Sequence, residues 1–316
     1  MKLKHEKEIE KYEKAINELK NQNKKNPVWT KKEISNLEKK LCELKEKVYS
    51  NLSPIERVAI SRHPLRPNSL DYIKNICEEF EEIFGDRLFR NDNAIVTALG
   101  KINKKKFIFV GLEKGKDTNS RIYRNFGMAH PEGYRKALRA MKLAAKFNIP
   151  IVTFLDTPGA FPGLSAEERG QGWAIAKNLL EMSRLPTHII VVLIGEGCSG
   201  GALGIGVGDK IGMLEHAYYS VISPEGCASI LWKDSSKSDK AAFFLKMQAE
   251  DMLKLKIIDT IIKEPLGGAH HDLNFIYKNV KDFILNSLNE LEEISIKELL
   301  DLRYRRFRNI GKFIFE

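Results

Sequence analysis

The chain has 316 residues, of which 43% are hydrophobic, enough for one large core or for one core with an appendage. No apolar run is long enough to cross a bilayer, and the lysine-rich start lacks the apolar segment of a secretory signal, so we expect a cytoplasmic protein. The net charge of +10 favours an anionic partner, but no RNA-binding aromatic signature accompanies it, so specific nucleic-acid binding is not expected. The four scattered cysteines have no C-x-x-C spacing, which argues against a disulfide framework or a zinc site in this chain: Cys42, Cys77, Cys198 and Cys227.

Residues 1–50 are predicted to form a charged helical hairpin. They contain 14 lysines and 9 glutamates, so they carry half of the net positive charge. Two narrow apolar seams repeat at intervals of three and four residues, as helices require, with Asn26-Pro27 as the break between them. The first seam is Ile9, Tyr12, Ile16 and Leu19, and the second is Ile34, Leu37, Leu41, Leu44 and Val48.

Residues 51–91 are predicted to be an irregular connector followed by a helix over residues 71–84. From residue 92 to 316 we expect the main α/β domain, with helices at its C-terminal end. Its first two strands, residues 94–102 and 106–112, should pair through a turn at residues 103–105. The following Gly115-Lys116-Asp117 resembles a phosphate-binding loop only superficially, because the Walker spacing fails.

A strand, a glycine turn and a helix follow one another after residue 150. An amphipathic helix is predicted over residues 134–147, and residues 151–155 read as a buried strand. The turn of residues 156–163 contains two glycines, and Ser165-Ala-Glu-Glu168 has the pattern of a capping box that would start the next helix, through Met182.

The same unit recurs about forty residues later. Residues 189–194 read as a buried strand, the glycines up to Gly201 force a tight turn, and residues 202–207 can begin a short helix. Such a corner presents unpaired backbone N–H groups that can hold an anion or a developing oxyanion.

Three interpretations of this corner compete. Gly195-x-Gly197-x-x-Gly200 matches a dinucleotide fingerprint with Glu215 as the ribose-binding acid. Gly197-x-Ser199-x-Gly201 matches the nucleophile elbow of hydrolases, and its partners would come from the downstream set Asp209, His216, His270 and His271. The third interpretation uses only backbone amides, as an oxyanion hole.

The repeated unit favours the third interpretation. Two neighbouring turns would bring two backbone donors together, whereas residues 202–207 are too short for the crossover helix of a dinucleotide fold. The hydrolase alternative stays open, because a sequence does not show where the histidines lie.

Several long motifs resemble the carboxyltransferase α subunit of the multisubunit, bacterial-type acetyl-CoA carboxylase. They extend over nearly the whole chain and include Arg124-Asn-Phe-Gly-Met128, Pro131-Glu-Gly-Tyr-Arg-Lys-Ala137, Asp156-Thr-Pro-Gly-Ala160, Ser199-Gly-Gly-Ala202 and Glu264-Pro-Leu-Gly-Gly-Ala-His270. The resemblance implies a crotonase-like (ClpP-like) spiral of strand–turn–helix units. It also implies transfer of a carboxyl group from carboxybiotin, on a separate biotin carboxyl carrier protein, to acetyl-CoA, giving malonyl-CoA for fatty-acid synthesis.

The resemblance further implies an α2β2 assembly with a β subunit that carries zinc, while this chain carries no metal. ATP would be used by the biotin carboxylase subunit of the full complex. Both reacting groups develop negative charge on an oxygen, and no side-chain base is obligatory, which suits a site made of amides.

We therefore expect the amides of Gly200 and Gly201 to form the oxyanion hole, with a further donor from the turn of Gly159 and Ala160. Arg124 is the candidate for holding the transferred carboxylate, because its guanidinium suits bidentate recognition, and Arg135 competes for the role. Glu196 is expected to orient the turn rather than act as a base.

Three further side chains are expected to be structural. Cys198 stands where the family usually has glycine, and a hole made of main-chain N–H groups should tolerate it, although the thiol could be oxidised. His216 and Cys227 are expected to pack rather than react.

Overall fold

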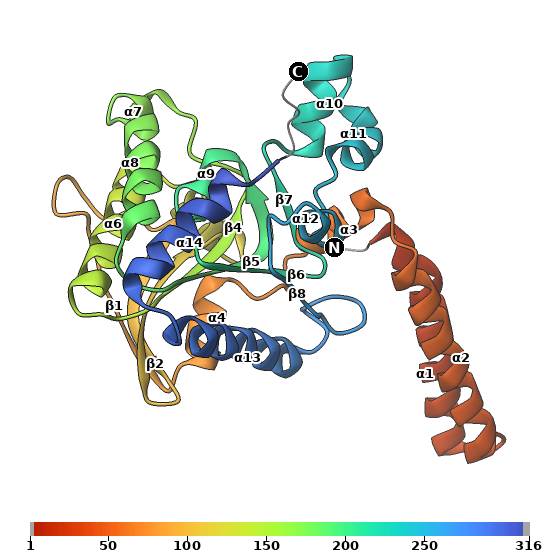
Figure 1. The fold of residues 1–316 in the computed structure, drawn as a ribbon. Helices are drawn as coiled ribbons and strands as arrows, with labels where there is room; N and C mark the ends of the chain where they lie inside the picture. The colour runs from red at the N-terminus through yellow and green to blue at the C-terminus, as the bar shows by residue number, and fades with distance from the viewer. Residues whose placement is uncertain (1–2, 312–316) are drawn as a thin grey trace.

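An eight-stranded mixed sheet forms the centre of the computed structural model, which describes residues 3–311 (Figure 1). Strands β1, β2 and β3 are antiparallel at one edge, and the sheet continues in parallel through β4, β5, β6 and β8, while β7 pairs with the outer part of β5. The strands are β1 (Glu79–Glu82), β2 (Ile95–Ile102), β3 (Lys105–Leu112), β4 (Ile151–Thr157), β5 (Ile189–Cys198), β6 (Lys210–Leu214), β7 (Tyr218–Ser220) and β8 (Thr260–Ile262).

The predicted strands are confirmed. Every residue of β4 and β5 is buried, as their unbroken β-branched and leucine runs require in a parallel sheet covered on both faces. β5 extends to Cys198, four residues beyond the predicted end. The loop between β2 and β3 has positive φ at Asn103 and Lys104, the conformation of a two-residue hairpin turn.

Helices cover the two faces of the sheet. α6 (Pro131–Lys146) and α8 (Gln171–Arg184) pack together on one side with α14 (Ile296–Arg308), while α4 (Ser69–Ile76) and α13 (Leu273–Glu292) lie on the other (Figure 1). Further helices are η1 (Lys4–Glu6), α5 (Thr118–Tyr123), η2 (Asn125–Gly127), α10 (Pro224–Trp232), η3 (Ser235–Lys237), α11 (Ser238–Leu245) and α12 (Ala249–Lys254).

The helix predicted over residues 71–84 is wrong in its second half. α4 ends at Ile76, Cys77 is already extended, and β1 then joins the edge of the sheet by pairing with β2. Phe80 packs against the core from this strand, so tertiary pairing overrides the helical pattern. The segment predicted as an irregular connector also contains a helix, α3 (Pro54–Ser61), which Ser53 and Glu56 cap reciprocally.

The predicted capping box is wrong too. Ser165 lies inside a single turn of helix, α7 (Leu164–Glu167), and the chain then breaks at Gly170, which has a left-handed φ of 79°. α8 starts only at Gln171. After β5 the short helix is α9 (Ser199–Leu203), which starts three residues before the predicted position, so Gly200 and Gly201 belong to the helix itself.

The N-terminal hairpin is confirmed. α1 (Lys7–Lys25) and α2 (Lys31–Ser50) run antiparallel and project from the body (Figure 1). Ile9 and Ile16 are buried, whereas Tyr12 is 53% exposed and lies outside the seam where it was predicted. Among residues 3–311, no helix combines the length and apolar character that a membrane span requires.

Candidate active site

Two glycine turns meet at the carboxyl ends of β4 and β5. The strands are parallel neighbours, so the turn after β4 and the start of α9 after β5 emerge side by side. A Cβ atom added to Gly201 would lie 2.4 Å from the carbonyl carbon of Gly159 and 2.6 Å from the nitrogen of Ala160. Only glycine allows this approach, so the two predicted turns are in direct backbone contact.

The first turn of α9 offers unpaired amides. The N–H groups in the first turn of an α-helix have no carbonyl acceptor within the helix, and in α9 these include the amides of Gly200 and Gly201. Cys198, the N-cap residue, provides no side-chain cap. A Cβ atom on Gly200 would meet only the side chain of Ile175, at 3.5 Å, so the space beside this amide is open.

The turn after β4 offers one further amide. The Gly159 N–H donates to Thr157 Oγ1 at 3.1 Å and is therefore already paired. Among residues 3–311, the Ala160 N–H has no such acceptor. Of the two predicted donors in this turn, Ala160 is the one that remains available.

Thr157 also connects this turn to residues 125–127, the loop that follows Arg124. Its Oγ1 lies 2.7 Å from the carbonyl oxygens of both Gly127 and Gly159. The loop has positive φ at Asn125, Phe126 and Gly127, a run of conformations that non-glycine residues rarely adopt. Such a run persists only where the surroundings hold it in place, and it follows directly after Arg124.

The two candidate arginines have different surroundings. Arg124 Nη1 donates to the Asn93 carbonyl oxygen at 2.9 Å, and within residues 3–311 the side chain forms no ion pair. Arg135 instead donates from Nε to the buried Asp86 at 2.8 Å and from Nη1 to the Arg169 carbonyl oxygen at 3.2 Å. Arg135 is thus engaged in holding α6, and Arg124 is the better candidate for a substrate contact.

A cluster of buried charges lies directly beneath the two turns. Glu196 accepts hydrogen bonds from Arg62 Nε at 2.6 Å, from the Tyr218 hydroxyl at 2.6 Å and from Lys114. Lys114 also pairs with Asp156 at 2.7 Å, and Asp156 in turn accepts from the Glu196 amide at 2.9 Å. The cluster joins β3, β4 and β5 at the end of the sheet where the turns emerge.

These partners fix the ionisation of Glu196. Burial alone would raise the pKa of its carboxyl group, but the charges of Lys114 and Arg62 outweigh this effect and lower the pKa to about 2. A carboxylate with so low a proton affinity and three donors is a poor base, in agreement with the predicted orienting role.

The comparisons with known proteins agree on one family. The family model described as acetyl co-enzyme A carboxylase carboxyltransferase-like matches residues 2–311. The acetyl-coenzyme A carboxylase carboxyl transferase subunit alpha of Chlamydia pneumoniae is 60% identical over 311 residues, which cover 98% of this chain and 96% of the relative. The subunit alpha of Protochlamydia amoebophila is 60% identical over 312 residues, covering 99% and 98%.

The chain belongs to this carboxyltransferase family.

Two solved structures share the fold. A transcarboxylase 12S structure with methylmalonyl-coenzyme A bound aligns with a TM-score of 0.57 at 18% identity over 71% of this chain and 41% of its own. A Pseudomonas malonate decarboxylase hetero-tetramer aligns with a TM-score of 0.54 at 14% identity over 66% and 84%. This chain therefore spans about two fifths of the transcarboxylase chain. The shared architecture confirms the predicted α/β, crotonase-like fold of the carboxyltransferase family.

The hydrolase interpretation has no support from the placement of its residues. Asp209 pairs with Arg303 and accepts from the amide of Ile189, at the opposite end of β5 from Ser199. His216 donates its amide to Glu264, and His270 and His271 lie near Glu6. No histidine contacts Ser199 among the described residues.

The dinucleotide interpretation fails for a similar reason. Glu215 pairs with Lys263 rather than lying beside the glycine turn, and the helix after β5 has only five residues.

The departure from the family pattern at Cys198 is tolerated. The thiol is buried and donates to the Tyr218 hydroxyl at 3.4 Å. Burial raises its pKa to about 11, so the reactive thiolate is suppressed and oxidation is disfavoured. His216 is buried, as predicted for a packing residue.

Sequence reasoning missed the residues that support the turns, above all Lys114, Arg62 and Thr157. A usable signal existed for Lys114, because the side chains that follow parallel strands converge at one edge of a sheet. Lys114 comes two residues after β3, which neighbours β4. Arg62 lies 134 residues before Glu196, and no local pattern links the two.

Proposed function

We propose that this chain is the α subunit of an acetyl-CoA carboxylase carboxyltransferase. In this role it takes part in transferring a carboxyl group from carboxybiotin, on a biotin carboxyl carrier protein, to acetyl-CoA, giving malonyl-CoA for fatty-acid synthesis. Its partners would be a zinc-bearing β subunit in an α2β2 assembly and, in the full complex, the ATP-dependent biotin carboxylase. We place this assembly in the cytoplasm.

One observation carries the proposal: unpaired amides converge where two glycine turns touch. The N–H groups of Gly200 and Gly201 begin α9, and the free Ala160 N–H lies in the turn that Gly201 contacts. Several donors fixed by backbone are what a developing oxyanion requires, since they need no reorganisation during the reaction.

The residues present fit a carboxybiotin substrate. When bound, this group supplies the activated carboxyl group, and the protein has to bind and orient it. The ureido oxygen of biotin is a good acceptor for the amides of Gly200 and Gly201. The negative charge of the nearby Glu196 carboxylate is balanced by Lys114 and Arg62.

Arg124 would hold the transferred carboxylate. Its loop is tied to the β4 turn through Thr157, and the guanidinium forms no ion pair within residues 3–311. The N–H groups that are not used on the Asn93 carbonyl oxygen can bind a carboxylate through two parallel hydrogen bonds. Arg135 would then position α6 rather than contact substrate.

Reconstitution tests both parts of this proposal. The chain is co-purified with a β subunit, and biotin-dependent decarboxylation of malonyl-CoA is measured. We expect activity from the complex and a loss of roughly 10²-fold in kcat/KM for Arg124→Ala, the typical cost of one charge-stabilising donor. Arg121→Ala, in the helix α5 that directly precedes Arg124, is the matched control and should stay close to the parent.

The two parts fail separately. An inactive parent complex would contradict the carboxyltransferase assignment. An active complex in which Arg124→Ala and Arg121→Ala behave alike would contradict only the role of Arg124.

A further inference from the structure

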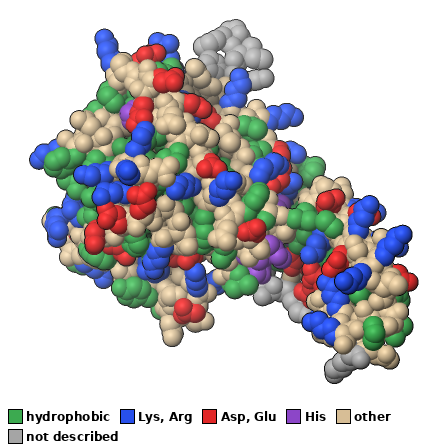
Figure 2. All heavy atoms as spheres, turned by 90° about the horizontal axis from the view of Figure 1, so that it is seen from below, with side chains coloured by type: hydrophobic (Ala, Val, Ile, Leu, Met, Phe, Trp, Pro, Cys, Tyr) green, Lys and Arg blue, Asp and Glu red, His purple; other side chains and the backbone are tan. Residues whose placement is uncertain are grey.

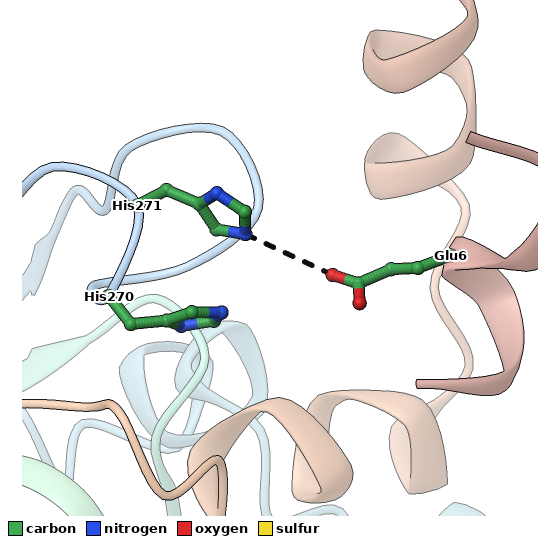
Figure 3. Close-up of side chains that lie close together, drawn as sticks. All are labelled: Glu6, His270 and His271. Atoms are coloured by element: carbon green, nitrogen blue, oxygen red, sulfur yellow. Dashed lines mark ion pairs between the residues drawn. The ribbon is translucent and has the colours of Figure 1, made fainter. Parts of the chain in front are cut away.

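A cluster of metal-ligating side chains lies where the N-terminal hairpin meets the body. It consists of Glu6, at the end of η1, and His270 and His271, in the loop after β8. Their ligand atoms all lie within 4.8 Å of one another, and His271 Nε2 is 4.0 Å from Glu6 Oε1 (Figure 3). Histidine and acidic side chains gather at this junction on the molecular surface (Figure 2).

The donor set suits a divalent transition metal. Two imidazoles and one carboxylate are a common ligand set for zinc, with a water molecule as the fourth ligand. Neighbouring ligands in a tetrahedral zinc site are about 3.4 Å apart, given bonds of about 2.1 Å. Rotations of exposed or half-buried side chains that close the present gaps by about 1 Å would therefore complete the site.

Neighbouring side chains help to orient the candidate ligands Glu6 and His270. The Tyr49 hydroxyl donates to Glu6 Oε1 at 2.6 Å and so orients the carboxylate, as a supporting hydrogen bond does in established metal sites. His63 stacks on His270 with the ring centroids 3.9 Å apart. His270 Nδ1 is buried and has no hydrogen-bond partner within the described residues.

The local charge favours a cation. A pocket of about 170 Å³ beside the cluster is lined by Glu6, Glu10, Glu13 and His271, with Lys45 as its one cation. Lys45 is paired with Glu13 at 2.5 Å. Among the described residues, the pocket thus places three carboxylates and one lysine beside the His271 imidazole.

The loop backbone presents both histidines. Gly267 and Gly268 have positive φ values of 98° and 109°, and a Cβ atom on Gly267 would lie 2.6 Å from the His271 ring. The glycine pair therefore permits a tight turn that brings two consecutive imidazoles toward Glu6, more than 260 residues away in sequence.

We propose that Glu6, His270 and His271 form a binding site for a divalent transition metal, Zn²⁺ in the first instance, that fastens the N-terminal hairpin to the body. The cysteine spacing argued against a zinc site in this chain, and the family resemblance placed zinc on the β subunit, but the site proposed here uses no cysteine. Its position at the base of the hairpin, away from the glycine turns, gives the metal a structural role.

Zinc titration of the full-length chain, purified without a histidine tag and stripped with chelator, tests the site. Calorimetry should give one Zn²⁺ per chain, and Co²⁺ should give the visible absorption of a site with nitrogen and oxygen ligands. Zn²⁺ should also raise the thermal midpoint, because a ligand that binds only the folded state stabilises it.

Two variants remove one ligand each, Glu6→Gln and His271→Ala. Each should weaken Zn²⁺ binding by at least about 100-fold, since even the loss of a hydrogen bond to a ligand typically costs 10–100-fold. Each should also abolish the zinc-dependent rise in the thermal midpoint. Both side chains are near the surface, so the metal-free variants should fold like the parent.

Two controls separate this site from general attraction of cations. Glu13→Gln removes the same charge from the same pocket but no ligand, and it should bind Zn²⁺ like the parent. Cys42→Ser removes the exposed thiol on α2 and should also leave binding unchanged. A parent that binds no Zn²⁺, or ligand variants that bind as tightly as the parent, would overturn the proposal.

Discussion

Glu196 illustrates how single residues support the site. It lies between Gly195 and Gly197 near the end of β5, and Arg62, Tyr218 and Lys114 donate to its carboxylate. The glycine that precedes it, Gly195, also helps to accommodate this group of charges. A Cβ atom on Gly195 would lie 2.4 Å from Asp156 Oδ1, so glycine there makes room for the neighbouring carboxylate.

Glu196→Gln should destabilise the fold by about 3 kcal/mol at neutral pH. Breaking a buried ion pair typically costs 3–5 kcal/mol, and the low end applies because Lys114 keeps Asp156 and Arg62 keeps Glu225. Thermal or denaturant unfolding measures the difference.

The pH dependence of this difference follows from the lowered pKa. The folded-state pKa of about 2 lies below the ordinary value of 4.5, so the stabilisation is fully present above about pH 4.5. It is lost as the pH falls toward 2, and the variant and the parent should converge there. A constant difference between pH 7 and 3 would show that shape rather than charge explains the effect.

Gly200 and Gly201 differ in how much room is available for an added side chain. Gly200→Ala should fold normally and gain up to about 1 kcal/mol of helix stability, because only Ile175 lies near the added methyl group. If the Gly200 amide binds substrate, this methyl group narrows the site, and we expect kcat/KM to fall about tenfold or more, a loss of about 1.4 kcal/mol.

Gly201→Ala should instead lower the thermal midpoint, since its methyl group would overlap the Gly159–Ala160 backbone. The contact with the β4 turn makes Gly200 the sharper position. Normal activity in a well-folded Gly200→Ala complex would contradict the amide site.

Ser199→Ala should keep most of the activity. The hydroxyl is exposed, and no histidine lies beside it among the described residues. The backbone φ of 55° is left-handed and equally unfavourable for serine and alanine, so stability should change little. Steady-state kinetics of the complex, with labelling by a fluorophosphonate as the second assay, would reveal a serine nucleophile if there were one.

At the scale of elements, Arg303 fastens α14 to the body. The side chain is buried, and all five of its N–H groups are used: two on Asp209 and three on the carbonyl oxygens of Met182, Leu185 and Thr187. The guanidinium thus caps the carboxyl end of α8 and pairs with a buried carboxylate in one contact.

Arg303→Lys should cost about 3 kcal/mol or more of unfolding free energy. Lysine keeps the charge but has neither the forked geometry nor the number of donors, so buried acceptors stay unpaired. Chemical denaturation compares it with Arg305→Ala, in which an exposed pair with Asp301 is lost and the expected cost is at most about 0.5 kcal/mol. Equal effects of the two substitutions would contradict the fastening role.

The elements that sequence predicted well are those with a strong local signal. The buried runs of β4 and β5, the seams of the hairpin and the turn between β2 and β3 each specify one conformation. Residues 77–84 were mistaken for helix because their partner strand β2 lies elsewhere in the sequence. Serine is a favoured residue at the start of a helix, so Ser165 was a reasonable candidate for the cap. The main helix, α8, begins only after the left-handed Gly170.

The candidate site was predicted to a similar extent. The two glycine turns and their adjacency followed from the repeated unit. The engagement of Arg135 with Asp86, the pairing of the Gly159 amide with Thr157 and the cluster around Lys114 all depend on contacts between distant segments. No local pattern contains that information.

For the whole molecule, the notable feature is how much apolar surface the chain leaves exposed. Large side chains on α10 and α11 lie in solvent, and the two helices protrude from the body (Figure 1). The exposed side chains on these helices are Ile230, Leu231, Phe243 and Phe244. Apolar surface of this kind marks interaction sites, in agreement with a subunit that works in an assembly.

The isolated chain should therefore have no carboxyl-transfer activity above background. It supplies one set of converging amides, whereas the proposed reaction develops charge on two oxygens. The assay compares the chain alone with the chain plus β subunit. Turnover by the chain alone at the rate of the complex would contradict the need for a partner.

The projecting hairpin is long, so a small rotation at its base would move its far end by several ångströms. With 20 residues, α2 is about 30 Å long. A rotation of about 10° at its base would swing the tip through about 5 Å, given the rise of about 1.5 Å per residue. The few side chains at the junction, Glu6, His271 and Tyr49 among them, therefore set the reach of the whole arm. A substitution that alters these contacts would therefore be expected to shift the far end of the hairpin by several times the displacement at its base.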